Sequence, residues 1–205
     1  MNAFYFLFSD NDEIFSFIYF VKEIFHVSYS NIFILIKETL VTFLIDLLLF
    51  YFLERKIMDD MEKILISACL VGDKVRYDGK SQYHPLIKEL LEKYELVPFC
   101  PEVEGGLKTP RKPSEIKKDK VINEEGRDVT RFFKEGASKA LNICKYLDIK
   151  IAILKDGSPS CGSSEIHSGN FDGRMVKGKG ITTTLLEQSG IKVYSEKEIE
   201  KLLEK

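Results

Sequence analysis

The chain of 205 residues is long enough for one α/β domain of roughly 150 residues and an appendage. Its net charge of −2 creates no strong field of either sign, so we expect no nucleic acid polymer as a partner. These averages conceal a change of composition near residue 60. Residues 1–60 hold 11 of the 15 phenylalanines and none of the 13 glycines, 6 prolines or 4 cysteines. The sequence therefore predicts an apolar extension over residues 1–60 and a separate domain over residues 61–205.

The extension contains apolar runs that charged residues interrupt. No uncharged stretch reaches the roughly 18 residues of a clear membrane span, Asp46 would be costly in lipid, and the start lacks the features of a signal peptide. Three interpretations stay open: a membrane or interfacial anchor, a helical arm that packs on a partner, and translated upstream sequence from a start codon assigned too early. We favour the last, because all turn-forming residues lie beyond residue 60. We expect a cytoplasmic protein, with membrane contact through residues 1–60 as the less favoured alternative.

From Met61 onward, strand patterns alternate with helix patterns. Short apolar runs predict strands at 63–67, 96–99, 149–154 and 191–194, and a short extended piece at 120–122. Apolar residues at helical spacing predict helices at 85–94, 128–147, 181–188 and 196–204. This alternation predicts a three-layer, Rossmann-like α/β domain with a mainly parallel four-stranded sheet, preceded by the apolar helical extension. The loop at 100–113 is too rich in glycine and proline for an ordinary connection, which is typical of functional loops.

Three cysteines follow three predicted strands. Cys69 comes after the first, Cys100 directly after the second, and Cys161 lies in the segment Ser158-Pro159-Ser160-Cys161-Gly162 after the third. Because open α/β sheets bind ligands at the carboxyl ends of their strands, we expect these thiols to converge at one edge. The fourth, Cys144, lies on the apolar stripe of the helix at 128–147, and we interpret it as a buried hydrophobic residue.

Three convergent thiols allow several kinds of chemistry. They can bind zinc, hold an iron-sulfur cluster, form a disulfide with one thiol to spare, or act as nucleophiles. A structural disulfide is the weakest of these for a protein of a reducing compartment, and the gaps of 31 and 61 residues lack the closely spaced pairs of usual zinc sites. A four-iron cluster tolerates such spacing, and three thiolates would leave one iron open to substrate. The spacing alone does not choose among these alternatives.

Four motifs add a family resemblance. They are Ser67-Ala68-Cys69-Leu70-Val71-Gly72, Arg76-Tyr77-Asp78-Gly79, Cys100-Pro101-Glu102-Val103 with Gly105-Gly106-Leu107 and Pro110-Arg111, and Ser158-Pro159-Ser160-Cys161-Gly162. Together they resemble the bacterial and archaeal thiouracil desulfidase family, over residues 61–205 and with the motifs in family order. The resemblance implies a non-redox desulfidase with a 4Fe-4S cluster bound by Cys69, Cys100 and Cys161. Its open iron would take sulfur from a small thiolated pyrimidine, 2-thiouracil or a thiouridine, while oxygen from water replaces it.

The residues near the cysteines supply candidates for proton transfer and substrate binding. Glu102, two residues after Cys100, is the expected general acid or base. Ser158 and Ser160 are candidate hydrogen-bond donors to the ring oxygen or the cluster sulfides, although Ser-Pro-Ser is also ordinary turn chemistry. Three other charged residues could hold the pyrimidine or close loops by ion pairing, and we favour the structural role: Arg76, Asp78 and Arg111. His84 and His167 carry no signal beyond a position in a loop.

Two further questions stay open at this point. Gly178-Lys179-Gly180 before a helix resembles an anion-binding turn, yet Thr183 stands where the dinucleotide fingerprint requires its third glycine, which disfavours a Rossmann oxidoreductase. If the turn binds a phosphate or a ribose, the substrate is a thiouridine nucleoside or nucleotide. Two alternative functions remain: a metal-binding module without turnover, and a sulfurtransferase that uses a cysteine nucleophile.

Overall fold

The structure, a computed structural model, describes residues 31–204, and the first half of the predicted extension lies outside them. The chain divides at Asp60–Met61 into two units. Of the first unit, helix α2 (Asn31–Asp60) is described. It exposes large apolar side chains, among them Phe43, Phe50 and Tyr51. Among the described residues, we find no helix with both the length and the apolar character that a membrane crossing requires.

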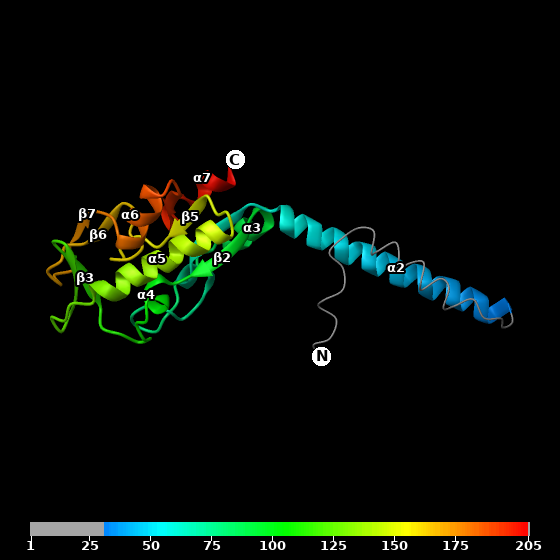
Figure 1. The fold of residues 1–205 in the computed structure, drawn as a ribbon, viewed down its shortest axis with the longest axis horizontal. Helices are drawn as coiled ribbons and strands as arrows, with labels where there is room; N and C mark the ends of the chain where they lie inside the picture. Colours follow the sequence, from blue (N-terminus) through cyan, green and yellow to red (C-terminus); the bar gives the residue numbers. More distant parts are fainter. Residues whose placement is uncertain (1–30, 205) are drawn as a thin grey trace. The chain divides into compact units, whose positions relative to one another are not determined.

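Residues 61–205 form an α/β unit around one parallel sheet (Figure 1). Its strands, in the order β2-β1-β5-β8, are β2 (Glu95–Phe99), β1 (Lys63–Ser67), β5 (Ile151–Leu154) and β8 (Lys192–Ser195). Every neighbouring pair in this sheet is parallel. The prediction of a four-stranded, parallel, three-layer domain is therefore confirmed.

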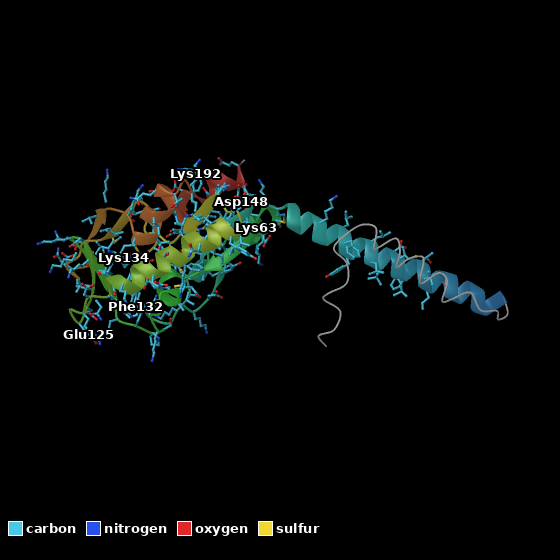
Figure 2. The ribbon with its side chains drawn as sticks, in the orientation of Figure 1. Lys63, Glu125, Phe132, Lys134, Asp148 and Lys192 are labelled. Atoms are coloured by element: carbon cyan, nitrogen blue, oxygen red, sulfur yellow. The ribbon has the colours of Figure 1, made fainter. Side chains whose placement is uncertain are left out.

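Helices cover both faces of the sheet. One face packs against α3 (Ile87–Lys93) and α7 (Ile199–Leu203), and the other against α5 (Thr130–Tyr146) and α6 (Ile181–Gln188). Adjacent residues of a strand serve opposite faces: Ile64 lies in the first core and Leu65 in the second. This alternation explains why β1 is a continuous apolar run, as expected for a strand covered on both sides. The charged side chains of Lys134, Asp148 and Lys192 point outward (Figure 2).

The order of the strands creates a switch point between β1 and β5. The chain passes from β1 through α3 to β2 on one side, and then crosses through α5 to β5 on the other side of β1. Successive connections thus leave β1 in opposite directions and open a crevice at the carboxyl ends of the strands. The three loops that carry Cys69, Cys100 and Cys161 all start at this edge.

Two short hairpins beside the sheet were not predicted. One pairs β3 (Ser114–Lys117) with β4 (Lys120–Asn123), of which the sequence indicated only residues 120–122. The other pairs β6 (Glu165–His167) with β7 (Met175–Lys177). A short helix, α4 (Pro101–Glu104), follows Cys100, and two 3-10 helices, η1 (Ala68–Val71) and η2 (Glu196–Glu198), follow β1 and β8. The predicted closing helix at 196–204 is therefore split between η2 and α7.

Candidate functional site

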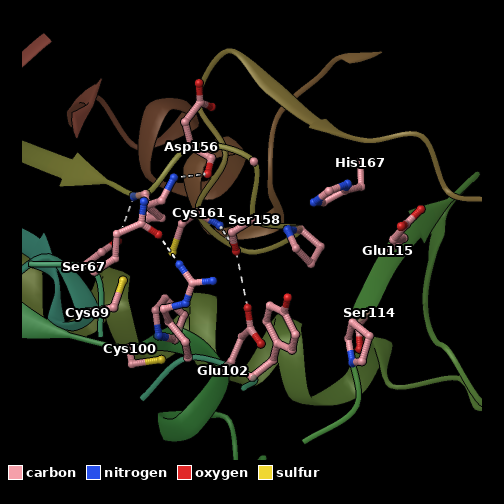
Figure 3. A pocket seen from close by; sticks show the side chains of 18 of the residues that line it. Ser67, Cys69, Cys100, Glu102, Ser114, Glu115, Asp156, Ser158, Cys161 and His167 are labelled. Atoms are coloured by element: carbon pink, nitrogen blue, oxygen red, sulfur yellow. Dashed lines mark hydrogen bonds between the residues drawn. The ribbon is translucent and has the colours of Figure 1, made fainter. Parts of the chain in front are cut away.

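A cavity of about 590 Å³ lies at the carboxyl edge of the sheet. Cys69, Cys100 and Cys161 all line it, together with Glu102 and Ser158 (Figure 3). The sequence predicted that three separate strands bring their thiols to one edge, and the structure brings them to one cavity. The fourth cysteine, Cys144, is buried in the core between α5 and the sheet.

Each cysteine of the cavity is held by its own local structure. Cys69 lies in η1, its carbonyl accepting hydrogen bonds from Gly72 and Gln82. Cys100 is the N-cap residue of α4, whose first helical position is Pro101. This short helix packs so tightly on α5 that a Cβ at Gly136 would lie 1.8 Å from the carbonyl oxygen of Pro101. Hydrogen bonds and packing therefore hold the backbone at Cys69 and Cys100.

The loop of Cys161 is held by the N-terminus of α6. Backbone N–H groups of Ile181 and Thr182 donate to the carbonyls of Pro159 and Ser160, at 3.0 and 2.9 Å. The hydroxyl of Thr183 donates to the carbonyl of Cys161 at 2.8 Å. A Cβ at Gly180 would lie 2.3 Å from the carbonyl oxygen of Ser160, so glycine is required for this close approach. The first N–H groups of α6 thus bind the cysteine loop.

This packing argues against the anion-binding turn considered for Gly178-Lys179-Gly180. The donors that such a turn would offer are already used by the loop of Cys161, and a Cβ at Gly178 would lie 2.8 Å from the side chain of Ile166. Lys179 forms an ion pair with Glu187 at 2.5 Å. The glycines of this segment therefore have a packing role, and none of its residues lines the cavity.

Asp156 is a buried carboxylate beneath the Cys161 loop that the sequence analysis missed. Its Oδ1 accepts hydrogen bonds from the backbone N–H groups of Ser163, Ser164 and Glu165, at 3.1 to 3.2 Å. Its Oδ2 accepts from the hydroxyl of Ser164 at 2.6 Å and from Lys197 Nζ at 3.2 Å. Burial acts to raise its pKa, but these hydrogen bonds outweigh burial and hold the pKa well below its ordinary value. Asp156 thus fixes the turn after Cys161.

The three thiols of the cavity are mutually close enough to interact electrostatically. Burial, and next the neighbouring Cys100, raise the pKa of Cys69 to about 11. Burial is also the main cause that raises the pKa of Cys100 and Cys161, and for Cys161 both other thiols add to the effect. With their pKa values raised, the three free thiols stay protonated by themselves, and a cation bound among them would be needed to hold them as thiolates. A metal centre that binds all three as thiolates fits this donor set.

Within the part of the chain that the structure describes, no three His, Cys, Asp or Glu side chains are arranged around the position of a single metal ion. An iron-sulfur cluster needs a different arrangement of its ligands, because each thiolate binds a different iron. The sulfurs of its ligands therefore lie around an extended group. Cys69, Cys100 and Cys161, which all line one cavity, fit this arrangement.

Glu102 is held between Arg111 and Ser158. Arg111 Nε donates to Glu102 Oε2 at 2.8 Å, and the Ser158 hydroxyl donates to Glu102 Oε1 at 3.3 Å. The side chains of Arg111 and Glu102 are only 9 % and 15 % exposed. Arg111 Nη1 also donates to the carbonyl of Val75 at 3.0 Å, which ties the loops after β1 and β2 together. Arg111 thus holds loops together, which is the structural role that the sequence favoured. It also forms an ion pair with Glu102, the candidate acid or base.

The two serines of the Ser-Pro-Ser segment have different positions. The Ser158 hydroxyl lines the cavity and accepts hydrogen bonds from the N–H groups of Ser160 and Cys161, at 3.1 and 3.2 Å. The Ser160 side chain is fully buried and its hydroxyl hydrogen-bonds to Thr182 Oγ1 at 3.0 Å, outside the cavity lining. The structure therefore brings Ser158 to Glu102 but does not bring Ser160 into the site, because the turn at Pro159 directs the two hydroxyls to opposite sides.

The remaining charged candidates, Arg76 and Asp78, pair with each other. Arg76 lines the cavity and pairs with Asp78 at 3.3 Å, and its guanidinium also binds Gln82. Asp78 accepts a further hydrogen bond from the N–H of Lys80, which is the main cause of its lowered pKa. These contacts close the loop of residues 76–82, in agreement with the favoured structural role.

The chain is similar to a curated protein and to a solved structure. An uncharacterised protein of Bacillus subtilis (strain 168), YbbK, is 39 % identical over 150 residues, which cover 68 % of this chain and 99 % of that protein. A solved structure, described as the 4Fe-4S-dependent thiouracil desulfidase TudS, is 47 % identical with a TM-score of 0.66, and the match covers 69 % of this chain and 95 % of that one. Residues 64–198 match the family model of 2-thiouracil desulfurase. The chain therefore belongs to the 2-thiouracil desulfurase family.

Proposed function

We propose that the chain is an iron-sulfur-dependent desulfidase that converts the C=S group of a thiolated pyrimidine to C=O and releases sulfide. The observation that carries this proposal is the convergence of Cys69, Cys100 and Cys161 on one cavity that also contains the Glu102–Arg111 ion pair. The family match and the likeness to TudS support it. The substrate class is 2-thiouracil or a thiouridine. We also propose a cytoplasmic location, because free thiols suit a reducing compartment.

In this proposal Cys69, Cys100 and Cys161 hold a 4Fe-4S cluster. When bound, the cluster supplies an open iron that acts as a Lewis acid toward the sulfur of the thiocarbonyl. The overall exchange consumes one water, whose oxygen forms the new carbonyl and whose hydrogens leave with the sulfur as hydrogen sulfide. The reaction needs no oxidant and no reductant. The role of the protein is therefore to orient the substrate and to move protons.

Glu102 is the group that moves these protons. Its carboxylate lines the cavity, and the ion pair with Arg111 and the hydrogen bond from Ser158 hold both of its oxygens in a fixed orientation. A carboxylate at this place accepts a proton from the attacking water and returns it to the departing sulfur. The hydroxyl of Ser158 already donates to Glu102, so we assign Ser158 to positioning the carboxylate and the loop of Cys161. We assign Ser160 no direct part in the reaction.

Anaerobic sulfide release from 2-thiouracil and thiouridine, by protein reconstituted with iron and sulfide, tests this function. We expect sulfide and the oxygenated pyrimidine in equal amounts, without an added redox partner. Iron binding without sulfide release would instead support the metal-binding module. A cysteine persulfide formed in iron-free protein from a donor of sulfane sulfur, such as thiosulfate, would support the sulfurtransferase, although burial of the thiols, which raises their pKa, disfavours a free thiolate nucleophile.

A further inference from the structure

Lys155 and Glu196 form an ion pair at the ends of two neighbouring strands of the sheet. Lys155 comes directly after β5 and Glu196 directly after β8, and Lys155 Nζ lies 2.6 Å from Glu196 Oε1. The two side chains are 22 % and 10 % exposed. The other carboxylate oxygen of Glu196 accepts a hydrogen bond from the N–H of Asp156 at 2.7 Å. The pair therefore has a fixed orientation at the carboxyl edge of the sheet.

The positive end of this pair is the end that belongs to the cavity. Lys155 lines the cavity, whereas Glu196 does not. Lys155 Nζ also donates to the carbonyl of Asp156 at 2.9 Å, and within the described residues these two acceptors are the only ones that bond to it. Because an ammonium group has three N–H bonds, one of them has no acceptor in that part of the chain.

Lys155 is also tied to the end of the cavity that carries Cys69. Its backbone N–H donates to Ser67 Oγ at 3.0 Å, and Ser67 ends β1 two residues before Cys69. Burial is the main cause that raises the pKa of the Cys69 thiol, and the charges of Arg76 and Lys155 act in the opposite direction. The ammonium group of Lys155 is therefore near enough to favour a thiolate at this position.

The other cations that line the cavity differ from Lys155 in the position of their partners. Two of them pair with carboxylates that line the same cavity, so that each positive charge is opposed there: Arg111 with Glu102, and Lys197 with Asp156 and Glu165. The partner of Arg76 is Asp78, which does not line the cavity but is 27 % exposed, so solvent screens this pair more than it screens Glu196. Lys155 therefore combines a charge in the lining with a buried partner outside it.

We propose that Lys155, held in place by Glu196, supplies the positive charge that stabilises the thiolates of the cluster site. The inference rests on the proposed function for the presence of the cluster, and it goes further in assigning these two residues to the electronic properties of the site. Charges and hydrogen bonds around the sulfur ligands set the reduction potential of an iron-sulfur centre. A positive charge beside the sulfurs also withdraws electron density from them, which favours the Lewis-acid chemistry of the proposed function. Lys155 should therefore raise the reduction potential, and Glu196, behind it, should lower it.

The midpoint reduction potential of the anaerobically reconstituted protein tests this role, measured without substrate in a redox titration followed by electron paramagnetic resonance. Lys155→Met removes the charge and keeps an unbranched side chain. The equilibrium constant for one-electron reduction should then fall about tenfold, which is a shift of about 59 mV to a more negative potential. Glu196→Gln keeps an oxygen that accepts hydrogen bonds and removes the negative charge, so the potential should rise. Lys155→Arg keeps the positive charge and should stay near the wild-type value.

Shifts of opposite sign distinguish an electrostatic role from a structural one, because loss of the ion pair alone affects both variants in the same way. Lys155→Met leaves a buried carboxylate without its partner, which is destabilising. The double variant Lys155→Met with Glu196→Gln leaves no unpaired charge, and its potential should also lie below that of the wild type. The matched control is Lys150→Met at the other end of β5, where Lys150 pairs with the exposed Asp148, and its potential should equal the wild-type value.

An unchanged or higher potential in both Lys155→Met and the double variant would overturn the inference, as would shifts of the same sign in Lys155→Met and Glu196→Gln. A protein with the expected potentials that releases no sulfide from thiolated pyrimidines contradicts the proposed function and leaves the role of Lys155 standing. A protein that releases sulfide but has the same potential in all these variants contradicts the inference alone. A protein that takes up no iron contradicts both.

Discussion

Arg111 and Glu102 form an ion pair of 2.8 Å in which both side chains are almost wholly buried. Surface pairs contribute little to stability or function, but a buried pair fixes the geometry of both groups. Here it holds a carboxylate in the cavity that three cysteines line. The pair therefore fixes the position of the carboxylate that we propose as the proton-transfer group.

Replacing Glu102 by glutamine should lower sulfide release by about two to four powers of ten, the usual effect of losing a positioned general acid or base. Iron content should remain near the wild-type value, because neither the carboxylate nor the amide is a ligand. Steady-state rates with protein of matched iron content measure the effect, and Glu104→Gln on the exposed side of the same short helix is the control. Wild-type turnover in Glu102→Gln would remove Glu102 from the mechanism.

Ser158→Ala and Ser160→Ala separate the two serines of the cysteine loop. Ser158→Ala removes an acceptor for two backbone N–H groups and a donor to Glu102, so we expect about 1 to 3 kcal/mol of lost stability together with slower turnover. Ser160→Ala removes only the contact with Thr182, so turnover per bound iron should hardly change. Thermal unfolding and turnover of the two variants, measured side by side, test this. Slower turnover in Ser160→Ala alone would restore the direct role that the sequence suggested for it.

Asp156→Asn should destabilise the protein by about 2 to 4 kcal/mol at neutral pH, because five hydrogen bonds converge on this carboxylate. The folded state lowers the pKa of Asp156 below its ordinary 3.8. Its contribution is therefore fully present above that value and is lost as the pH falls further, through the depressed folded-state pKa. Denaturant unfolding of both proteins from pH 7 down to pH 3 should show the difference in stability shrink only at the acid end. A difference that stays constant over this range would assign the effect to packing instead.

A chain that begins at Met61 should fold and keep its sulfide release. All strands of the parallel sheet, both hairpins and the cavity lie in residues 61–205, which form a unit distinct from residues 1–60. Circular dichroism and activity of the shortened protein, compared with the full chain, are the measurements. An insoluble or inactive product would assign the apolar extension a role in the fold or the site.

The sequence predicted the structure best where a single physical cause, such as burial of a strand on both faces, determines the residue pattern. The apolar run at 63–67 predicted β1 to the residue, because a strand buried on both faces leaves a continuous pattern. The convergence of the three thiols followed from strand direction alone. The hairpin β6–β7 left no such pattern, since Met175, Val176 and Lys177 are all exposed. For that reason His167 was interpreted as a loop residue although it faces the cavity.

The sequence also could not predict in which direction side chains point within loops. Ser158 and Ser160 are two residues apart, and nothing in Ser-Pro-Ser indicates which hydroxyl faces the cavity. Asp156 was missed because its partners are mainly backbone N–H groups, which any sequence supplies. The role of Gly180 stayed open for a related reason, since glycine before a helix is common to anion-binding turns and to close packing. The structure identifies close packing as the reason for this glycine, because the carbonyl oxygen of Ser160 would lie 2.3 Å from a Cβ at Gly180.

The central claim is that Cys69, Cys100 and Cys161 together hold the cluster at which sulfur is removed. Iron counting and sulfide release after anaerobic reconstitution of four single variants, each with one cysteine changed to serine, test it most directly. We expect each of Cys69→Ser, Cys100→Ser and Cys161→Ser to lose most of the iron and all sulfide release, while Cys144→Ser keeps both, because Cys144 lies in the core and outside the cavity. Full iron content and turnover in Cys161→Ser, or loss of both in Cys144→Ser alone, would contradict the account.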